Sequence, residues 1–92
     1  MEKYGTVLSL FKIDLGVTHN LRDQLFLGVL ESCDEELARR GVHLDLAVVE
    51  DQILLSDYSA WSYRHRTDDA PLPRNLDFRI RNRIVQGRAG HA

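Results

Sequence analysis

The 92-residue sequence has few of the residues that would cross-link it or hold it in a membrane. Its one cysteine, Cys33, excludes an internal disulfide. No apolar run approaches the roughly 20 residues that span a bilayer, and the first residues, Met1-Glu2-Lys3-Tyr4, lack the basic and apolar regions of a signal peptide. We therefore expect a cytoplasmic protein in which Cys33 is a small core residue rather than a reactive thiol.

Residue patterns typical of catalysis or metal binding are also absent. The histidines, at positions 19, 43, 65 and 91, do not pair with one another or with Cys33 at metal-ligand spacing. There is no glycine-rich phosphate loop. The acidic run Asp34-Glu35-Glu36 is typical of a solvated patch, since a magnesium site needs carboxylates from separate elements. We expect no enzymatic activity, no cofactor and no bound metal.

Neither glycine nor proline interrupts residues 48–66, which contain the only tryptophan. Helical spacing there gives two neighbouring stripes of apolar or small residues: Val49, Ile53, Ser56, Ala60 and Tyr63 in one, and Leu54, Tyr58 and Trp61 in the other. A helix that is apolar over so much of its circumference usually lies at the centre of a bundle. We predict a central helix with Trp61 largely buried.

Apolar spacing predicts three further helices, so that the four lie near residues 3–15, 20–40, 46–66 and 73–86. Four-residue ridges mark the second and last helices: Leu25, Val29, Cys33 and Leu37, with Phe26 and Leu30 beside them, and then Leu76, Ile80 and Ile84, with Phe78 and Val85 alongside. The segment 42–47 alternates like a strand but has no partner, so we interpret it as an extended connection. The prediction is one all-α domain over residues 1–86 and a flexible C-terminal tail at 87–92.

Glycine and short polar residues predict where these helices begin and end. Gly16 and Gly41 are expected to end the first two helices, because glycine readily takes a positive φ. Asn20 and Asp45 are candidate N-caps for the second and central helices. Gly28, inside the second helix, costs roughly 1 kcal/mol relative to alanine, which is tolerable if another backbone passes there.

Charge is divided unevenly along the chain. Residues 1–57 carry five cations against eleven acids, a net of −6, whereas residues 58–92 carry seven arginines against three acids, a net of +4. This division predicts either nucleic acid binding by the basic part or two unlike surfaces that attract one another on neighbouring copies. Ordinary solvated helix faces remain a third interpretation. The proline-containing segment 67–73 is too long and stiff for a helix-turn-helix reader.

One set of residues in the second half of the chain consists of Leu54-Leu55, Asp57-Tyr58, Ala60-Trp61, Tyr63-Arg64 and Arg66, then Leu72-Pro73-Arg74, Leu76, Arg79-Ile80 and Asn82-Arg83, with Lys12-Ile13-Asp14-Leu15-Gly16-Val17 upstream. In these residues the sequence resembles the small head–tail connector (adaptor) proteins of tailed bacteriophages. The resemblance extends over about residues 7–84. Ser59 and Ser62 depart from it, because an alanine or an aliphatic residue is expected at both positions.

The resemblance implies an all-helical subunit that assembles as a dodecameric ring in the neck of the virion, after synthesis in the host cytoplasm. Such a ring joins the portal protein to a head-completion or tail protein and leaves a channel through which DNA passes without sequence recognition. The rival interpretation is a small helical DNA-binding or regulatory protein that uses the arginine-rich last helix. The candidate interaction residues are Arg64, Arg66, Arg74, Arg79, Arg81, Arg83, Arg88, Asp34, Glu35 and Glu36.

Overall fold

Four α-helices make up the fold in the computed structural model, which describes residues 3–90. They are α1 (Gly5–Leu15), α2 (Asp23–Arg39), α3 (Val49–Arg64) and α4 (Arg74–Gly90). No strand occurs within residues 3–90, so the predicted all-α fold is confirmed. α4 continues to Gly90 instead of ending at residue 86, and residues 91 and 92 of the predicted tail lie outside the described residues.

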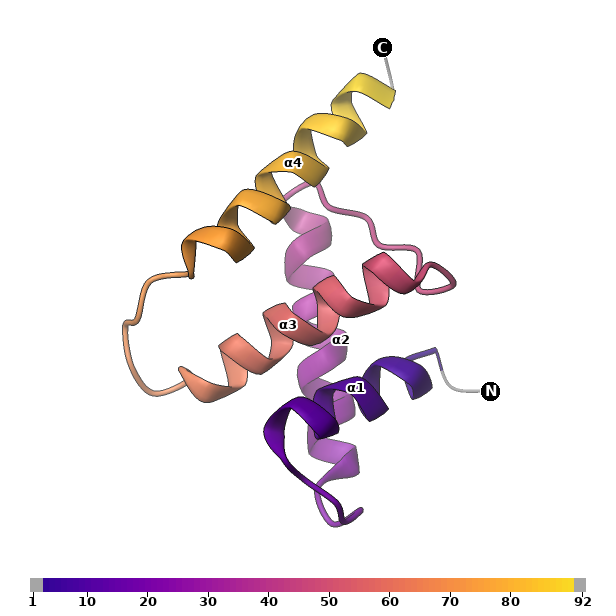
Figure 1. Ribbon diagram of the computed structural model, residues 1–92, viewed down its shortest axis with the longest axis vertical. Helices are drawn as coiled ribbons and strands as arrows, with labels where there is room; N and C mark the ends of the chain where they lie inside the picture. Colours follow the sequence, from indigo (N-terminus) through magenta and orange to yellow (C-terminus); the bar gives the residue numbers. More distant parts are fainter. Residues whose placement is uncertain (1–2, 91–92) are drawn as a thin grey trace.

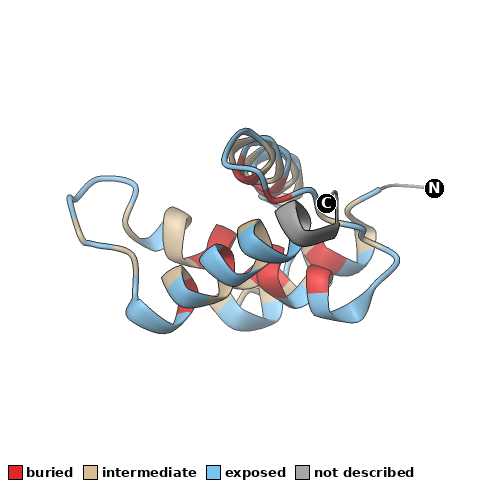
Figure 2. Cartoon of the chain, turned by 90° about the horizontal axis from the view of Figure 1, so that it is seen from above, coloured by how far each residue is buried: buried red, intermediate tan, exposed pale blue. Residues whose placement is uncertain are grey.

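α3 is the central helix, as the sequence predicted. In Figure 1 it crosses α2 and lies between α1 and α4. An aromatic cluster joins the first three helices: the ring of Phe11 lies 5.1 Å from that of Phe26, and the ring of Tyr63 lies 5.5 Å from that of Phe26, both edge to face. α4 adds Leu76 and Ile80 to the same core. Buried residues accordingly line the inward faces of the helices in Figure 2.

Glycines end the first two helices in the way the sequence predicted. Gly16 has φ 75° and Gly41 has φ 96°, the left-handed conformation that L-residues with a side chain rarely adopt. Beyond α2, the Val42 amide donates to the Leu37 carbonyl at 2.8 Å, which is the long hydrogen bond of a Schellman motif. Val42 and Leu37 are both buried, so this turn fixes the start of the connection to α3.

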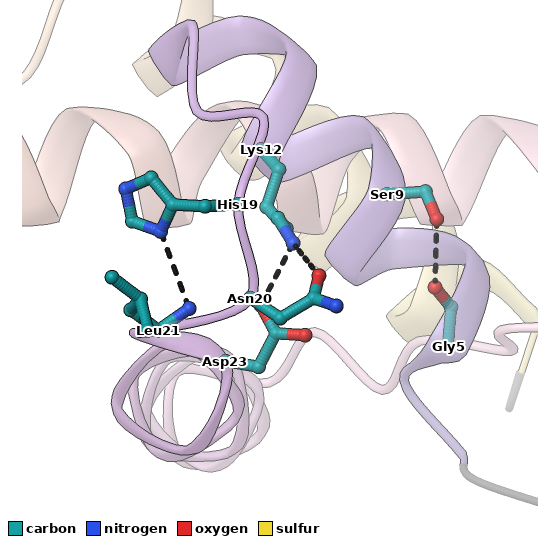
Figure 3. A network of polar contacts seen from close by, with 7 residues as sticks. All are labelled: Gly5, Ser9, Lys12, His19, Asn20, Leu21 and Asp23. Carbon is teal, nitrogen blue, oxygen red and sulfur yellow. Dashed lines mark hydrogen bonds and ion pairs between the residues drawn. The ribbon is translucent and has the colours of Figure 1, made fainter.

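The two predicted N-caps are wrong. α2 begins after Arg22 and α3 after Val48, and neither of these residues makes a side-chain cap. Figure 3 shows that Asn20 instead accepts a hydrogen bond from Lys12 Nζ, which also pairs with Asp23 at 2.8 Å. This lysine therefore ties the end of α1 to the start of α2.

Some predicted core positions are exposed. On α3, Val49 is 65% and Ile53 is 42% exposed, while Asp51 is buried. Leu25 on α2 and Phe78 and Val85 on α4 are also exposed large hydrophobic residues. The remaining predicted stripe positions are buried or packed against the core, so the spacing rule found the inward faces but also counted apolar residues that lie on the outer faces of α2, α3 and α4. Trp61 is not fully buried, but it packs against the core.

Candidate interaction surfaces

Arg83, predicted to be an exposed interaction residue, points back into its own subunit. Its Nη1 and Nη2 atoms bind the two carboxylate oxygens of Asp51, whose side chain is 6% exposed. The backbone N–H of Asp45 donates to the same carboxylate at 2.7 Å. One buried aspartate thus connects α3, α4 and the segment before α3, and the prediction of an exposed Arg83 is corrected.

Two more of the candidate arginines hold the subunit together. Arg79 on α4 pairs with Asp57 on α3 at 2.8 Å. Arg64, at the end of α3, pairs with Asp14 on α1 at 3.2 Å and donates to its backbone carbonyl at 2.7 Å. Each pair joins a cation from the basic last third to an acid from the acidic first part. Part of the charge asymmetry therefore stabilises the fold of a single copy.

The remaining candidate arginines are less committed to the fold. Arg66 lies over the Tyr63 ring, 4.1 Å from its centroid. Arg81 pairs only with Asp77, one turn away on α4. Arg74 is exposed and makes no hydrogen bond or ion pair among the residues that the structure describes. The side chain of Arg88 lies outside the described part. Among the α4 arginines whose side chains the structure describes, Arg74 and Arg81 are thus the most open to another molecule.

Two of the three candidate acids are also engaged within the subunit. Asp34 accepts a hydrogen bond from the Tyr4 hydroxyl at 2.9 Å, and Glu36 accepts one from the Tyr58 hydroxyl. Burial, together with the Glu36 carboxylate, raises the pKa of Tyr58 to about 12. Glu35 is exposed and forms no polar pair within residues 3–90, so it is the acid of this run that is open to another molecule.

An outer stripe runs along α4 on the side away from the core. It consists of Arg74, Phe78, Arg81 and Val85, which recur at intervals of three and four residues. Phe78 is 63% and Val85 62% exposed. The stripe therefore combines two apolar side chains with two cations on the surface.

A groove of about 440 Å³ lies between α2 and α3. Its apolar and small lining residues include Leu25, Gly28, Val29, Ser32, Ser62 and Tyr63. A Cβ atom built at Gly28 would meet nothing within 4 Å, so the glycine leaves the groove open rather than making room for a neighbour in the same chain. We call this feature the α2–α3 groove. From the sequence alone, Gly28 is only a possible site where another backbone passes close by.

Sequence reasoning missed Asp51 and the groove. The signal for Asp51 was its position three and four residues before Leu54 and Leu55, which puts an acid on the apolar side of a helix predicted to be central. Ser62 departs from the connector resemblance and lines the groove, but a polar residue alone could not indicate that. Among the described residues, no three metal-ligating side chains come together, and no helix is long and apolar enough to cross a bilayer.

Comparisons with protein-family models, with curated proteins and with solved structures find no match to this chain. The assignment of a function therefore depends on the chain's own residues and on the surfaces just described.

Proposed function

We propose that the protein is a structural subunit of a bacteriophage neck. In this proposal its copies form a ring that joins the portal to a head-completion or tail protein and leaves a channel for DNA. The connector-like residues support the proposal through their roles in the subunit, since Asp57 and Arg79 pair across α3 and α4, and Leu54, Leu55 and Tyr58 are buried. A subunit of this kind needs a rigid helical body with contact surfaces on its outside.

The observation that carries the proposal is the pair of unlike surfaces that remain after internal pairing. α2 presents the exposed acids Glu31 and Glu35, and α4 presents Arg74 and Arg81 beside exposed apolar residues. Contacts between unlike surfaces on successive copies produce closed rings when the rotation between the copies closes. Complementary charge at such contacts directs encounter and register more than it adds affinity.

If the proposal holds, the phage that carries this gene also encodes a portal protein, and the test uses that portal protein. Purified protein is mixed with portal complexes, and binding is followed by sedimentation and by electron microscopy of the end view. We expect a ring on the portal at low salt and weaker association as salt is added. Reversing Arg74 and Arg81 to glutamate should prevent assembly while circular dichroism shows an intact fold.

A matched control reverses Arg39 and Arg40, exposed cations at the C-terminal end of α2 that are not part of the outer stripe. This control should assemble as the parent does. If the Arg74 and Arg81 double variant assembles as well as the parent, the outer stripe is not part of the interface. If the parent does not bind portals, the neck function is contradicted.

The DNA-binding alternative rests on the exposed arginines Arg74 and Arg81. Arg79 and Arg83 form ion pairs with Asp57 and Asp51, so fewer cations of α4 are free to bind phosphates than the sequence indicates. If this alternative holds, the protein will be retained on heparin, and the double reversal will weaken duplex DNA binding and flatten its salt dependence.

A further inference from the structure

The glycine in the middle of α2 has no explanation within one copy of the chain. Gly28 lies in a helix interior, where glycine is unfavourable relative to alanine. Nothing in the same chain comes within 4 Å of the Cβ position, so internal packing does not require its small size. Leu25, one turn earlier, is left 52% exposed beside it. An open glycine next to an exposed leucine is the arrangement that lets another helix approach closely.

The outer stripe of α4 and the α2 side of the α2–α3 groove carry residues at the same interval. Phe78 and Val85 are seven residues apart, which is two helical turns or about 10 Å. Leu25 and Ser32 in the groove are also seven residues apart on α2 and therefore span the same distance. A helix that lays apolar residues at this spacing into an apolar groove is a recurrent mode of recognition.

The outer stripe and the α2 edge of the groove carry charges of opposite sign. Glu31 and Glu35 follow Gly28 and Ser32 by three residues, so they lie next to them on the surface of α2. Both acids are exposed and form no ion pair among the described residues. On the stripe, Arg74 and Arg81 flank Phe78 at similar intervals. Glu36 and Arg66 also line the groove, and Arg66 lies over the Tyr63 ring on the α3 side. A cationic apolar helix therefore fits along the acidic α2 edge of the groove.

We propose that the outer stripe of α4 in one copy docks into the α2–α3 groove of a second copy of this chain. The proposal rests on the proposed function in that it supplies the contact between neighbouring subunits of the ring. In the ring this contact runs one way, from the stripe of each copy to the groove of the next, and is therefore head to tail. Phe78 is the central anchor, in keeping with the weight of buried aromatic residues at interfaces.

Two variants test this pairing. The stripe variant carries Phe78→Glu and Val85→Glu, and the groove variant carries Gly28→Arg, which fills the groove and adds a cation facing Arg74 and Arg81. By sedimentation and light scattering, the parent should self-associate, whereas each variant alone should have its Kd raised at least about tenfold. An equimolar mixture should form heterodimers and nothing larger, since only one intact stripe and one intact groove can meet.

Matched controls carry the same kinds of substitution elsewhere. Ile13→Glu replaces an exposed apolar residue of α1, and Ser9→Arg adds a cation to the same helix. Both should self-associate as the parent does. Circular dichroism and urea midpoints confirm folding, and Phe78→Ser, which adds no charge, replaces the stripe variant if that variant is unfolded.

Three results would overturn the inference. The parent could stay monomeric up to millimolar concentration, the groove variant could dimerise alone through α4 against α4, or the mixture could fail to form heterodimers. The assay contains neither portal nor DNA. Self-association through these surfaces without portal binding would therefore contradict the neck function but support the contact between copies. Portal binding by the parent, together with a stripe variant that self-associates as the parent does, would support the neck function but contradict the contact.

Discussion

Arg83 on α4 binds both carboxylate oxygens of Asp51 on α3, and this contact connects the last helix to the rest of the fold. The same carboxylate holds the backbone amide of Asp45. Because α4 follows a long loop and adds mainly Leu76 and Ile80 to the core, its position depends strongly on this ion pair and on the pair between Arg79 and Asp57. The pair between Arg83 and Asp51 therefore stabilises the subunit itself rather than a contact with another molecule.

We predict that Asp51→Asn lowers the free energy of unfolding substantially. Breaking a buried ion pair by removing one partner costs roughly 3–5 kcal/mol, and the lower end applies here because the Arg83 side chain remains 27% exposed. Urea denaturation followed by circular dichroism measures the loss. Arg81→Gln is the matched control, because it breaks only the surface pair with Asp77 and should change stability by at most about 0.5 kcal/mol. Equal losses in the two variants would contradict the assigned role of Asp51.

The Asp51 carboxylate should also contribute to acid sensitivity. Burial alone would raise its pKa, but the hydrogen bonds from Arg83 and from the Asp45 amide, with the charge of Arg83, outweigh burial and lower the pKa below its usual value. Because the pKa of Asp51 is lower in the folded state than in the unfolded state, its carboxylate contributes its full stabilisation above about pH 4. That contribution is lost as the pH falls through the folded-state pKa.

The expected result is a difference between the parent and Asp51→Asn that is large at neutral pH and shrinks below about pH 4. Urea midpoints of both proteins, measured between neutral pH and the acid transition, give this difference directly. Other carboxylates titrate in both proteins and cancel in the comparison. A difference that stays constant through the acid range would show that the pKa of Asp51 is not depressed.

Local features of the fold could be predicted from the sequence, whereas the contacts between helices could not. Gly16 and Gly41 end their helices as predicted, since a positive φ depends on the residue itself. Asp51 and Arg83 are 32 residues apart, and their pairing depends on how α3 and α4 are rotated against each other. No spacing within either helix encodes that rotation.

The candidate site shows the same division. The arginines of the last helix were recognised as a group, but which of them face outward is decided by the acids on α3. Arg79 and Arg83 lie one turn apart and meet Asp57 and Asp51, which leaves Arg74 and Arg81 on the outer stripe. The groove could not be predicted because it needs α2 and α3 in place.

Replacing Gly28, inside α2, and Gly41, just after α2, by alanine should change the stability of the protein in opposite directions. Gly28→Ala should stabilise a single copy by roughly 0.5–1 kcal/mol, because the helix propensity improves and the added methyl group meets nothing. Gly41→Ala should destabilise it by about 1 kcal/mol or more, because the φ of 96° is strained for alanine. Urea midpoints at low protein concentration separate the two effects from assembly. A loss of stability in Gly28→Ala would mean that the position is packed within the subunit.

Trp61 provides the last prediction, since its indole ring is half-buried but its Nε1 atom is buried without a hydrogen-bond acceptor among the described residues. Its ring lies 5.9 Å from the rings of both Tyr58 and His65. Trp61→Phe keeps this ring contact and removes an unsatisfied donor, so we expect the free energy of unfolding to change by less than about 1 kcal/mol. Trp61→Ala loses the ring as well and should cost about 3 kcal/mol, the lower end for large aromatic residues because part of the ring is already exposed. Circular dichroism follows both variants, which no longer contain tryptophan. If the phenylalanine variant loses as much as the alanine variant, the indole N–H has a partner and its hydrogen bond contributes to the fold.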